Sequence, residues 1–197
     1  MLLTHDHHGD NLDDAGRALL AGVPTGGHDG AGRAKGRRDG AEALVDDPAR
    51  SAGQAHDHRH RHAVQARAAV QPPIAGAVIG FALSWEGQRG ALWVSGDTVL
   101  YGGVRAVARR IPVDVAVLHL GAVGFPITGP LRYSMTGDQA VALCALLRPR
   151  LVVPVHCAGW VHFREGRAEV EAAFRQAAPD VRDGVRWLEP GVPTPVS

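Results

Sequence analysis

The feature that most constrains the fold of this chain is an alternation of short apolar runs with longer stretches of helical periodicity, which starts near residue 76. The runs rich in β-branched residues are predicted strands, at residues 78–85, 91–97, 113–120, 150–156 and 185–188. Between them, residues 103–111, 136–148 and 165–178 have the pattern of helices. Near-continuous apolar runs such as VAVL and LVVPV are typical of a sheet covered on both faces. The sequence therefore predicts a layered α/β fold.

The boundaries of the predicted helix at residues 136–148 carry their own signals. Thr136 is a favoured N-cap residue, because its hydroxyl can accept a hydrogen bond from a free backbone N–H of the first turn. Pro149 cannot continue a helix, so it marks the stop after Arg148.

Length, charge and cysteine content exclude several classes of protein. The 197 residues suit a single domain, and 21 basic against 20 acidic residues give a net charge of +1, which favours neither nucleic acid nor an anionic membrane as a partner. No apolar run approaches the ~20 residues that span a bilayer. Cys144 and Cys157 do not form a disulfide framework. We therefore expect a cytoplasmic protein.

Residues 22–73 differ from the rest of the chain. Gly, Ala, Arg, Asp and His dominate, and large apolar side chains are scarce, so burial cannot offset the entropy of ordering this segment. We expect it to be disordered or irregular. The histidines at 56, 58, 60 and 62 alternate with charged residues and resemble a metal-binding tract.

An uninterrupted loop of this length is improbable inside a compact domain, where loops beyond ~15 residues are already uncommon. A GC-rich back-translation of residues 56–73, read in a shifted frame, gives MTTGTATPCRHGPPFSR, a β-prone run that contains a histidine. We therefore expect residues from about 25 to 72 to be translated in a shifted frame. On this hypothesis the alternating histidines have no ligand role.

The chain begins with a cluster of metal-ligating residue types, where a predicted strand end (MLLT) gives way to a predicted helix. Imidazole and carboxylate groups suit Zn²⁺, Fe and Mn²⁺. The candidates are His5, Asp6, His7, His8 and Asp10. The alternative is a solvated helix start with Asp10 or Asn11 as its N-cap.

Two further candidates follow predicted strands. In LWVSGDT the strand is followed by Asp97, and LVVPVH ends on His156, both at the carboxyl edge where α/β proteins bind their ligands. Each has a simpler alternative: Asp97 as a turn or cap residue, and His156 as a hydrogen-bonded core histidine. The order of a His/Asp cluster, GD, and His after a VxPVH strand is more specific than any of its parts.

That order resembles the metallo-β-lactamase-fold hydrolase superfamily, and HDHHGDNLD is similar to its L-ascorbate 6-phosphate lactonase-like branch. The run HLGAVGFPITGPLRYSMTGDQAVALCALLRPRLVVPVHCAGWVHF is similar to that branch as well. The family motif is usually HxHxDH, whereas this chain has HDHHGDN, with different spacing and Asn11 in place of a histidine. The resemblance covers residues 1 to about 22 and 74 to 190.

The resemblance implies a metal site with two ions, zinc first and Mn²⁺ or Fe as alternatives. It makes Asp97 the bridging carboxylate and His156 the last histidine ligand. The different spacing leaves the first ligands open: we favour His5, His8 and Asp10, and keep His7 and Asp6. The implied mechanism is metal activation of a water molecule, which Asp10 would orient, and polarisation of a carbonyl or phosphoryl oxygen.

The chain departs from the family pattern in two ways. Family members carry a β-rich segment before the histidine motif, whereas this chain begins four residues before His5. A further histidine expected between the first cluster and Asp97 is also missing. We therefore expect an incomplete αββα sandwich whose true beginning is absent, with its first sheet truncated and its second half well formed.

Two other histidines occur near the same predicted edge. His119 ends the run VAVLHL, where a core or supporting role is favoured over metal ligation. His162, in GWVHF, either lines a pocket mouth or packs within its loop.

Three functions are consistent with these features. The first is a metal-dependent hydrolase of a lactone, ester or phosphorylated small molecule. The second is a non-catalytic, truncated relative with an incomplete metal site. The third is a histidine-rich metal-binding protein that uses the tract at residues 56–62. We favour the hydrolase, with a small-molecule substrate as its partner and its oligomeric state left open.

Overall fold

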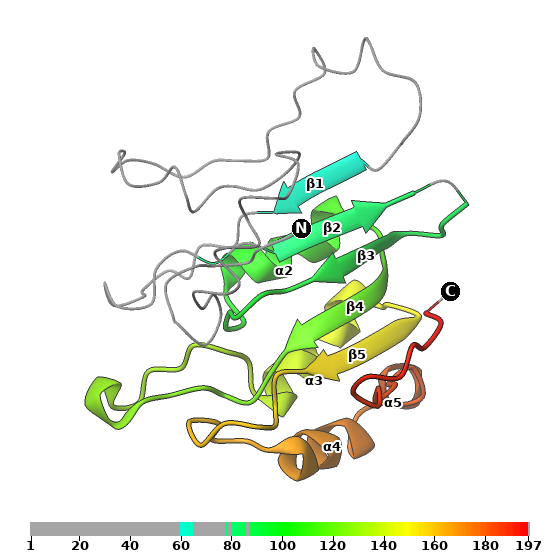
Figure 1. Ribbon diagram of the computed structural model, residues 1–197. Coiled ribbons are helices and arrows are strands. Elements are labelled where there is room, and N and C mark those ends of the chain that lie inside the picture. The colour runs from blue at the N-terminus through cyan, green and yellow to red at the C-terminus, as the bar shows by residue number, and fades with distance from the viewer. Residues whose placement is uncertain (1–59, 65–77, 79, 86, 197) are drawn as a thin grey trace, which may run out of the picture.

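A five-stranded mixed sheet organises the chain, with its strands in sequence order (Figure 1). The computed structural model describes residues 60–64, 78, 80–85 and 87–196. The strands are β1 (His60–Val64), β2 (Gly80–Ser84), β3 (Ala91–Val94), β4 (Val113–His119) and β5 (Leu151–Val155). β1 and β2 pair antiparallel, as do β2 and β3, whereas β3, β4 and β5 run parallel. The α/β class is therefore confirmed.

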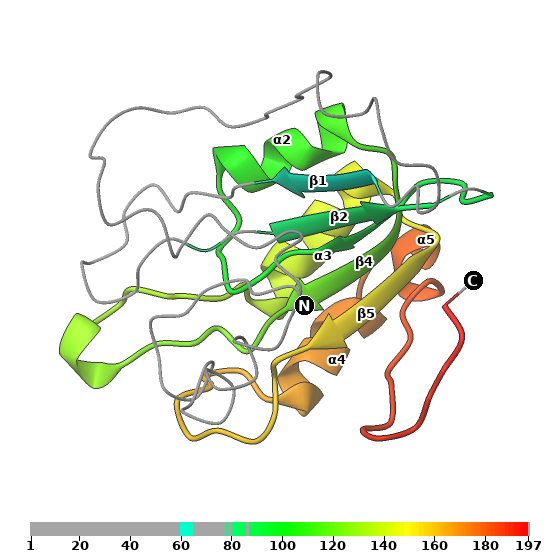
Figure 2. The same cartoon turned by 45° about the horizontal axis from the view of Figure 1, so that its top comes forward.

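The helices pack on one face of this sheet (Figure 2). They are α2 (Gly102–Arg110), α3 (Gly137–Leu147), α4 (Arg167–Arg175) and the short α5 (Pro179–Arg182), with a 3₁₀ turn, η3, at Pro126–Thr128. The three predicted helices are confirmed to within three residues at each end. Among the helices described, none combines the length and the apolar character that crossing a membrane requires.

The predicted boundaries of α3 are confirmed. The hydroxyl of Thr136 accepts a hydrogen bond from the backbone N–H of Gln139 at 3.1 Å, and the Gln139 side chain returns a contact to the Thr136 N–H at 3.4 Å. This is a capping box. At the other end, Arg148 adopts φ +50°, a left-handed conformation that ends the helix just before Pro149.

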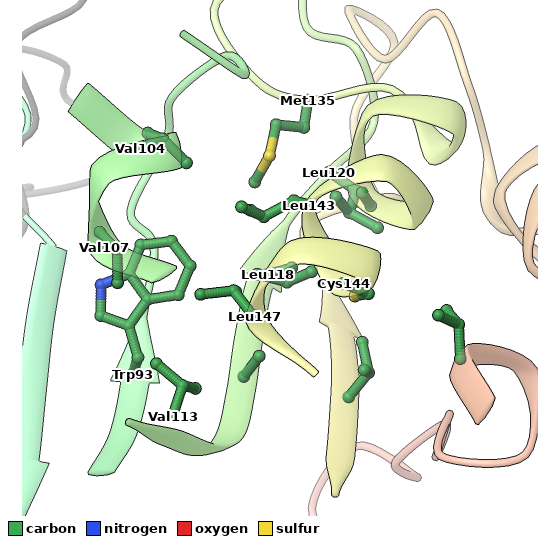
Figure 3. Close-up of a cluster of buried hydrophobic side chains, with 14 of the residues drawn as sticks. Trp93, Val104, Val107, Val113, Leu118, Leu120, Met135, Leu143, Cys144 and Leu147 are labelled. Carbon is green, nitrogen blue, oxygen red and sulfur yellow. The ribbon is translucent and has the colours of Figure 1, made fainter. Parts of the chain in front are cut away.

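The main hydrophobic core lies between the sheet and the helices. Figure 3 shows Trp93 of β3 and Leu118 of β4 facing Val107 of α2 and Leu143 of α3. These four side chains are at most 1% exposed. Because side chains alternate along a strand, Ala91 and Trp93 of β3 and Ala116 and Leu118 of β4 contribute to this core.

The opposite face of the sheet carries a smaller apolar cluster. Val115, Leu151 and Val153 are buried there, and Leu188 and Val196 of the C-terminal segment pack against them. We expected both faces of the sheet to be covered. In the described residues the C-terminal segment covers the second face at this cluster.

Two expectations need correction. The predicted strand at residues 185–188 is reduced to a single bridge between Val185 and Val152, because in the described residues this segment makes backbone hydrogen bonds to β5 at Val152 alone. Within the segment expected to be irregular, His60–Val64 form strand β1. Pairing with β2 uses backbone groups, so an edge strand can form from a charged sequence. The rest of that segment lies outside the described residues.

Candidate functional site

The carboxyl ends of three parallel strands lie side by side at one edge of the sheet (Figure 1). Asp97 follows β3, His119 is the last residue of β4, and His156 follows β5. A backbone hydrogen bond of 3.0 Å from the N–H of Leu120 to the carbonyl of Val155 holds the last two strand ends together. The parallel pairing therefore brings the predicted strand-end residues to one place.

The imidazole of His156 faces the carboxylate of Asp97. His156 Nε2 lies 3.5 Å from Asp97 Oδ2, and the two side chains are 27% and 20% exposed. The other ring nitrogen, Nδ1, lies 3.2 Å from the carbonyl oxygen of Leu120. A carbonyl can only accept, so Nδ1 carries the proton, and Nε2 of the neutral ring has a lone pair. Two electron-pair donors thus converge, an arrangement that suits a shared cation.

The backbone at this edge is strained. His156 has φ +60°, a conformation that residues other than glycine rarely adopt and that occurs disproportionately at functional sites. Gly121, at the end of β4, has φ +91°, and a Cβ on it would lie 2.5 Å from the carbonyl oxygen of His156. Only glycine allows the two strand ends to approach this closely.

His119 lies beside the pair. Its ring centroid is 5.7 Å from that of His156. Its backbone N–H donates to the hydroxyl of Ser95 at 3.0 Å, and the same hydroxyl lies 3.5 Å from His119 Nδ1. Ser95 is fully buried and donates to the carbonyl of Gly96 at 2.9 Å. This geometry suits the supporting role expected for His119, which stays a prediction.

Cys157, next to His156, is buried. Burial raises the pKa of its thiol, Arg167 lowers it and Glu171 raises it, with a net shift upwards. Cys157 is therefore a protonated thiol at neutral pH.

Two loops extend from the same edge, residues 121–135 after β4 and residues 157–165 after β5 (Figures 1 and 2). Their aromatic rings contact one another. His162 lies 5.8 Å from Trp160 and 5.4 Å from Phe125, between ring centroids. These contacts support packing of His162 within its loop, and its place at a pocket mouth stays a prediction.

The sequence indicated His162 within the motif GWVHF but gave no separate indication of Phe125 or Tyr133. The rings of these two residues lie 5.5 Å apart. The signal available was that both loops follow strand ends, where the sequence already placed ligand residues.

The remaining predicted ligands, His5, His7, His8 and Asp10, lie outside the described residues, as does Asp6. Within the described ranges, no group of three or more His, Cys, Asp or Glu residues is close enough together to hold a metal ion. The described part thus contributes the pair Asp97 and His156, and their ligation of a metal stays a prediction.

Comparison with known proteins gives relatives that are named metal-dependent hydrolases. The chain is 32% identical over 84 residues to the UPF0173 metal-dependent hydrolase of Desulfitobacterium hafniense, covering 42% of this chain and 30% of that protein. It is 38% identical over 77 residues to the protein of that name from Opitutus terrae, covering 39% and 29%. The relative from Thermofilum pendens is 31% identical over 106 residues, covering 54% and 41%. The chain thus spans less than half the length of these relatives.

Among solved structures, a metallo hydrolase from Ignicoccus hospitalis matches with a TM-score of 0.58 and 24% identity, covering 97% of this chain and 76% of that one. The isothiocyanate hydrolase from Delia radicum gut bacteria matches with a TM-score of 0.51 and 18% identity, covering 59% and 43%. These similarities concern the fold. No family model matches the chain.

In sequence the chain is similar to UPF0173 metal-dependent hydrolases, and in fold it is similar to a metallo hydrolase of known structure, as the resemblance to the metallo-β-lactamase-fold class led us to expect. Within that class, the three curated relatives described above carry the name UPF0173 metal-dependent hydrolase. Those names specify no substrate, so the lactonase-like branch stays a prediction.

Proposed function

We propose that this protein is a metal-dependent hydrolase of a small molecule that contains a lactone, ester or phosphate bond. Asp97 and His156 would be metal ligands, and the cluster at His5, His7, His8 and Asp10 would supply the others. Zinc is the favoured metal, because imidazole and carboxylate are its usual oxygen and nitrogen ligands. The names of the curated relatives support metal-dependent hydrolysis.

The observation that carries the proposal is the convergence of His156 Nε2 and Asp97 Oδ2 at 3.5 Å. Nδ1 of the same ring contacts the carbonyl of Leu120. A backbone carbonyl bonded to the second ring nitrogen is the usual partner of a metal-binding histidine, because it selects the tautomer and orients the ring. The donor set therefore fits a divalent cation such as Zn²⁺.

Each residue of the site would have a different role in hydrolysis. A bound metal supplies Lewis-acid polarisation of the scissile group and a lowered pKa for water. The carbonyl of Leu120 holds the imidazole of His156 in one orientation. Asp97 supplies negative charge beside that ring, and Asp10 would orient the attacking water. Partial exposure of Asp97 and His156 leaves the site open to a small substrate.

Zinc binding by the full, tag-free chain tests the proposal, with calorimetry and elemental analysis as readouts after treatment with a chelator. We expect bound zinc in the wild type, and an affinity about a hundredfold lower or worse in His156→Ala and Asp97→Ala, because each removes a ligand. Replacing His5 and His8 together by alanine should weaken binding similarly. The matched control replaces the histidines at 56, 58, 60 and 62 by alanine and should leave binding unchanged.

The other outcomes separate the alternatives. Loss of binding in the control alone would assign the metal to the histidine tract. A wild type that binds no zinc, Mn²⁺ or Fe would identify a non-catalytic relative. Hydrolysis of p-nitrophenyl acetate, a γ-lactone and p-nitrophenyl phosphate, with and without metal, then tests the bond type.

A further inference from the structure

We propose that the loops after β4 and β5 form a subsite for a planar aromatic part of the substrate that carries no positive charge. The inference rests on the proposed function in one respect, since it places the reacting bond at Asp97 and His156. It adds the class of substrate, an aromatic ester, lactone or phosphate.

A continuous series of rings leads from the candidate metal edge to the surface. The ring of His156 meets the ring of Phe163 at 4.8 Å in an edge-on arrangement. Phe163 in turn lies 5.1 Å from His162, again edge-on. His162 stacks on Trp160 at 5.8 Å with an angle of 22° between the ring planes. These separations are those of favourable aromatic pairs.

The outer end of this series is accessible. Trp160 is 54% exposed, and the next residue, Val161, is fully exposed. Exposed apolar side chains of this size cost free energy in water, and where they gather they mark binding sites. A flat ring laid against the indole of Trp160 would remove apolar area from both partners.

The two loops are held together before any ligand binds. The guanidinium of Arg164 donates to the carbonyl of Gly129 at 2.9 Å. The backbone N–H of Gly124 donates to the carbonyl of His162 at 3.3 Å. Both bonds cross from one loop to the other, so little ordering entropy remains to be lost on binding.

The charges of the loops favour neutral or anionic ligands. The two loops, residues 121–135 and 157–165, include Arg132 and Arg164 and one acidic residue, Glu165, whose carboxylate accepts a hydrogen bond of 2.8 Å from the N–H of Gly137 at the start of α3. Both arginines are exposed. A cationic ligand would meet the two exposed arginines, while the loop carboxylate of Glu165 is already hydrogen-bonded to α3.

Binding of 2-naphthoate to the full chain tests the subsite without turnover. Saturation-transfer NMR or tryptophan fluorescence measures the dissociation constant, with acetate and naphthyl-trimethylammonium as comparison probes. We expect naphthoate to bind, the other two to bind at least about tenfold more weakly, and Trp160→Ala to weaken naphthoate binding about three- to tenfold, the range that one aromatic pair supplies. Trp160→Phe should restore most of it.

Trp85→Ala is the matched control. Trp85 is 49% exposed, like Trp160, but it follows β2, which runs antiparallel to β3, so it lies at the opposite edge of the sheet. This variant should bind naphthoate as the wild type does.

The subsite would be overturned if the wild type did not bind naphthoate, or if the Trp160→Ala and Trp85→Ala variants lost affinity equally. It would also be overturned if Trp160→Ala changed the oligomeric state and left naphthoate binding unchanged, because this face would then be an interface between copies. Zinc binding with hydrolysis but no aromatic preference would leave the proposed function intact and remove the subsite. If naphthoate binding depended on Trp160 but the protein bound no zinc, the subsite would stand and the proposed function would fail.

Discussion

At the scale of single residues, His156 has the most constrained surroundings. Its backbone is left-handed, its Nδ1 contacts the carbonyl of Leu120, and its Nε2 faces Asp97. The sequence predicted His156 as a candidate because it ends a buried strand. The orientation of the ring could not be predicted, because it depends on a carbonyl from the neighbouring strand.

Cys144 leads to a residue-scale prediction about pH. Burial raises the pKa of its thiol from 9.0 to about 12, so the folded state retains a proton that the unfolded state releases above pH 9. The stabilising contribution is therefore complete below pH 9 and is lost as the pH rises towards 12. Urea unfolding at pH 8 and pH 10.5 should show a lower free energy of unfolding at the higher pH.

Cys144→Ala provides the comparison. Its free energy of unfolding should be lower at pH 8, because a buried side chain is truncated, but should fall less between the two pH values. Burial also raises the pKa of Tyr101 to about 12, so part of the decline should remain. An identical decline in variant and wild type would contradict the assignment to Cys144.

At the scale of elements, hydrophobic periodicity and the residues at helix ends predicted most of the strands and helices of the described chain. Helix α3 begins after Thr136 and ends at Leu147, close to the prediction, because capping and proline effects act within a few residues. The prediction of a strand at 185–188 was wrong, because strand formation depends on distant segments of the chain and not on local signals. A strand needs a partner along its length, and in the described residues Val185 forms a single bridge, to Val152 of β5.

The capping box gives an element-scale prediction. Thr136→Ala removes the acceptor of the Gln139 N–H and should lower the free energy of unfolding by about 1 kcal/mol, measured by chemical denaturation. Thr194→Ala is the control, since its hydroxyl donates to the carbonyl of Val192 in the C-terminal segment, away from the termini of the described helices. Equal effects of the two substitutions would show that the cap does not contribute.

At the scale of the whole molecule, the two faces of the sheet are unequally packed. Leu118 of β4 points into the core beneath the helices and is fully buried. Leu92 of β3 belongs to the opposite face and is only partly buried. The stability of the described fold therefore depends mainly on the face that the helices cover.

Truncating one leucine on each face of the sheet tests this difference in packing. Leu118→Ala should lower the free energy of unfolding by about 2–5 kcal/mol, the range for a leucine that leaves a buried cavity. Leu92→Ala should cost clearly less, because its side chain loses less contact area. Thermal and urea unfolding of both variants measure the difference. Equal costs would mean that the second face is packed as fully as the first.

The sequence by itself determined strands β2 to β5 and helices α2 to α4 and named Asp97 and His156, because periodicity, caps and strand ends are local signals. Only the tertiary structure decided that these two side chains converge and that Phe163, His162 and Trp160 line a path away from them. Parallel pairing of β3, β4 and β5 is the physical reason, since it joins segments that are distant in the chain at one edge of the sheet.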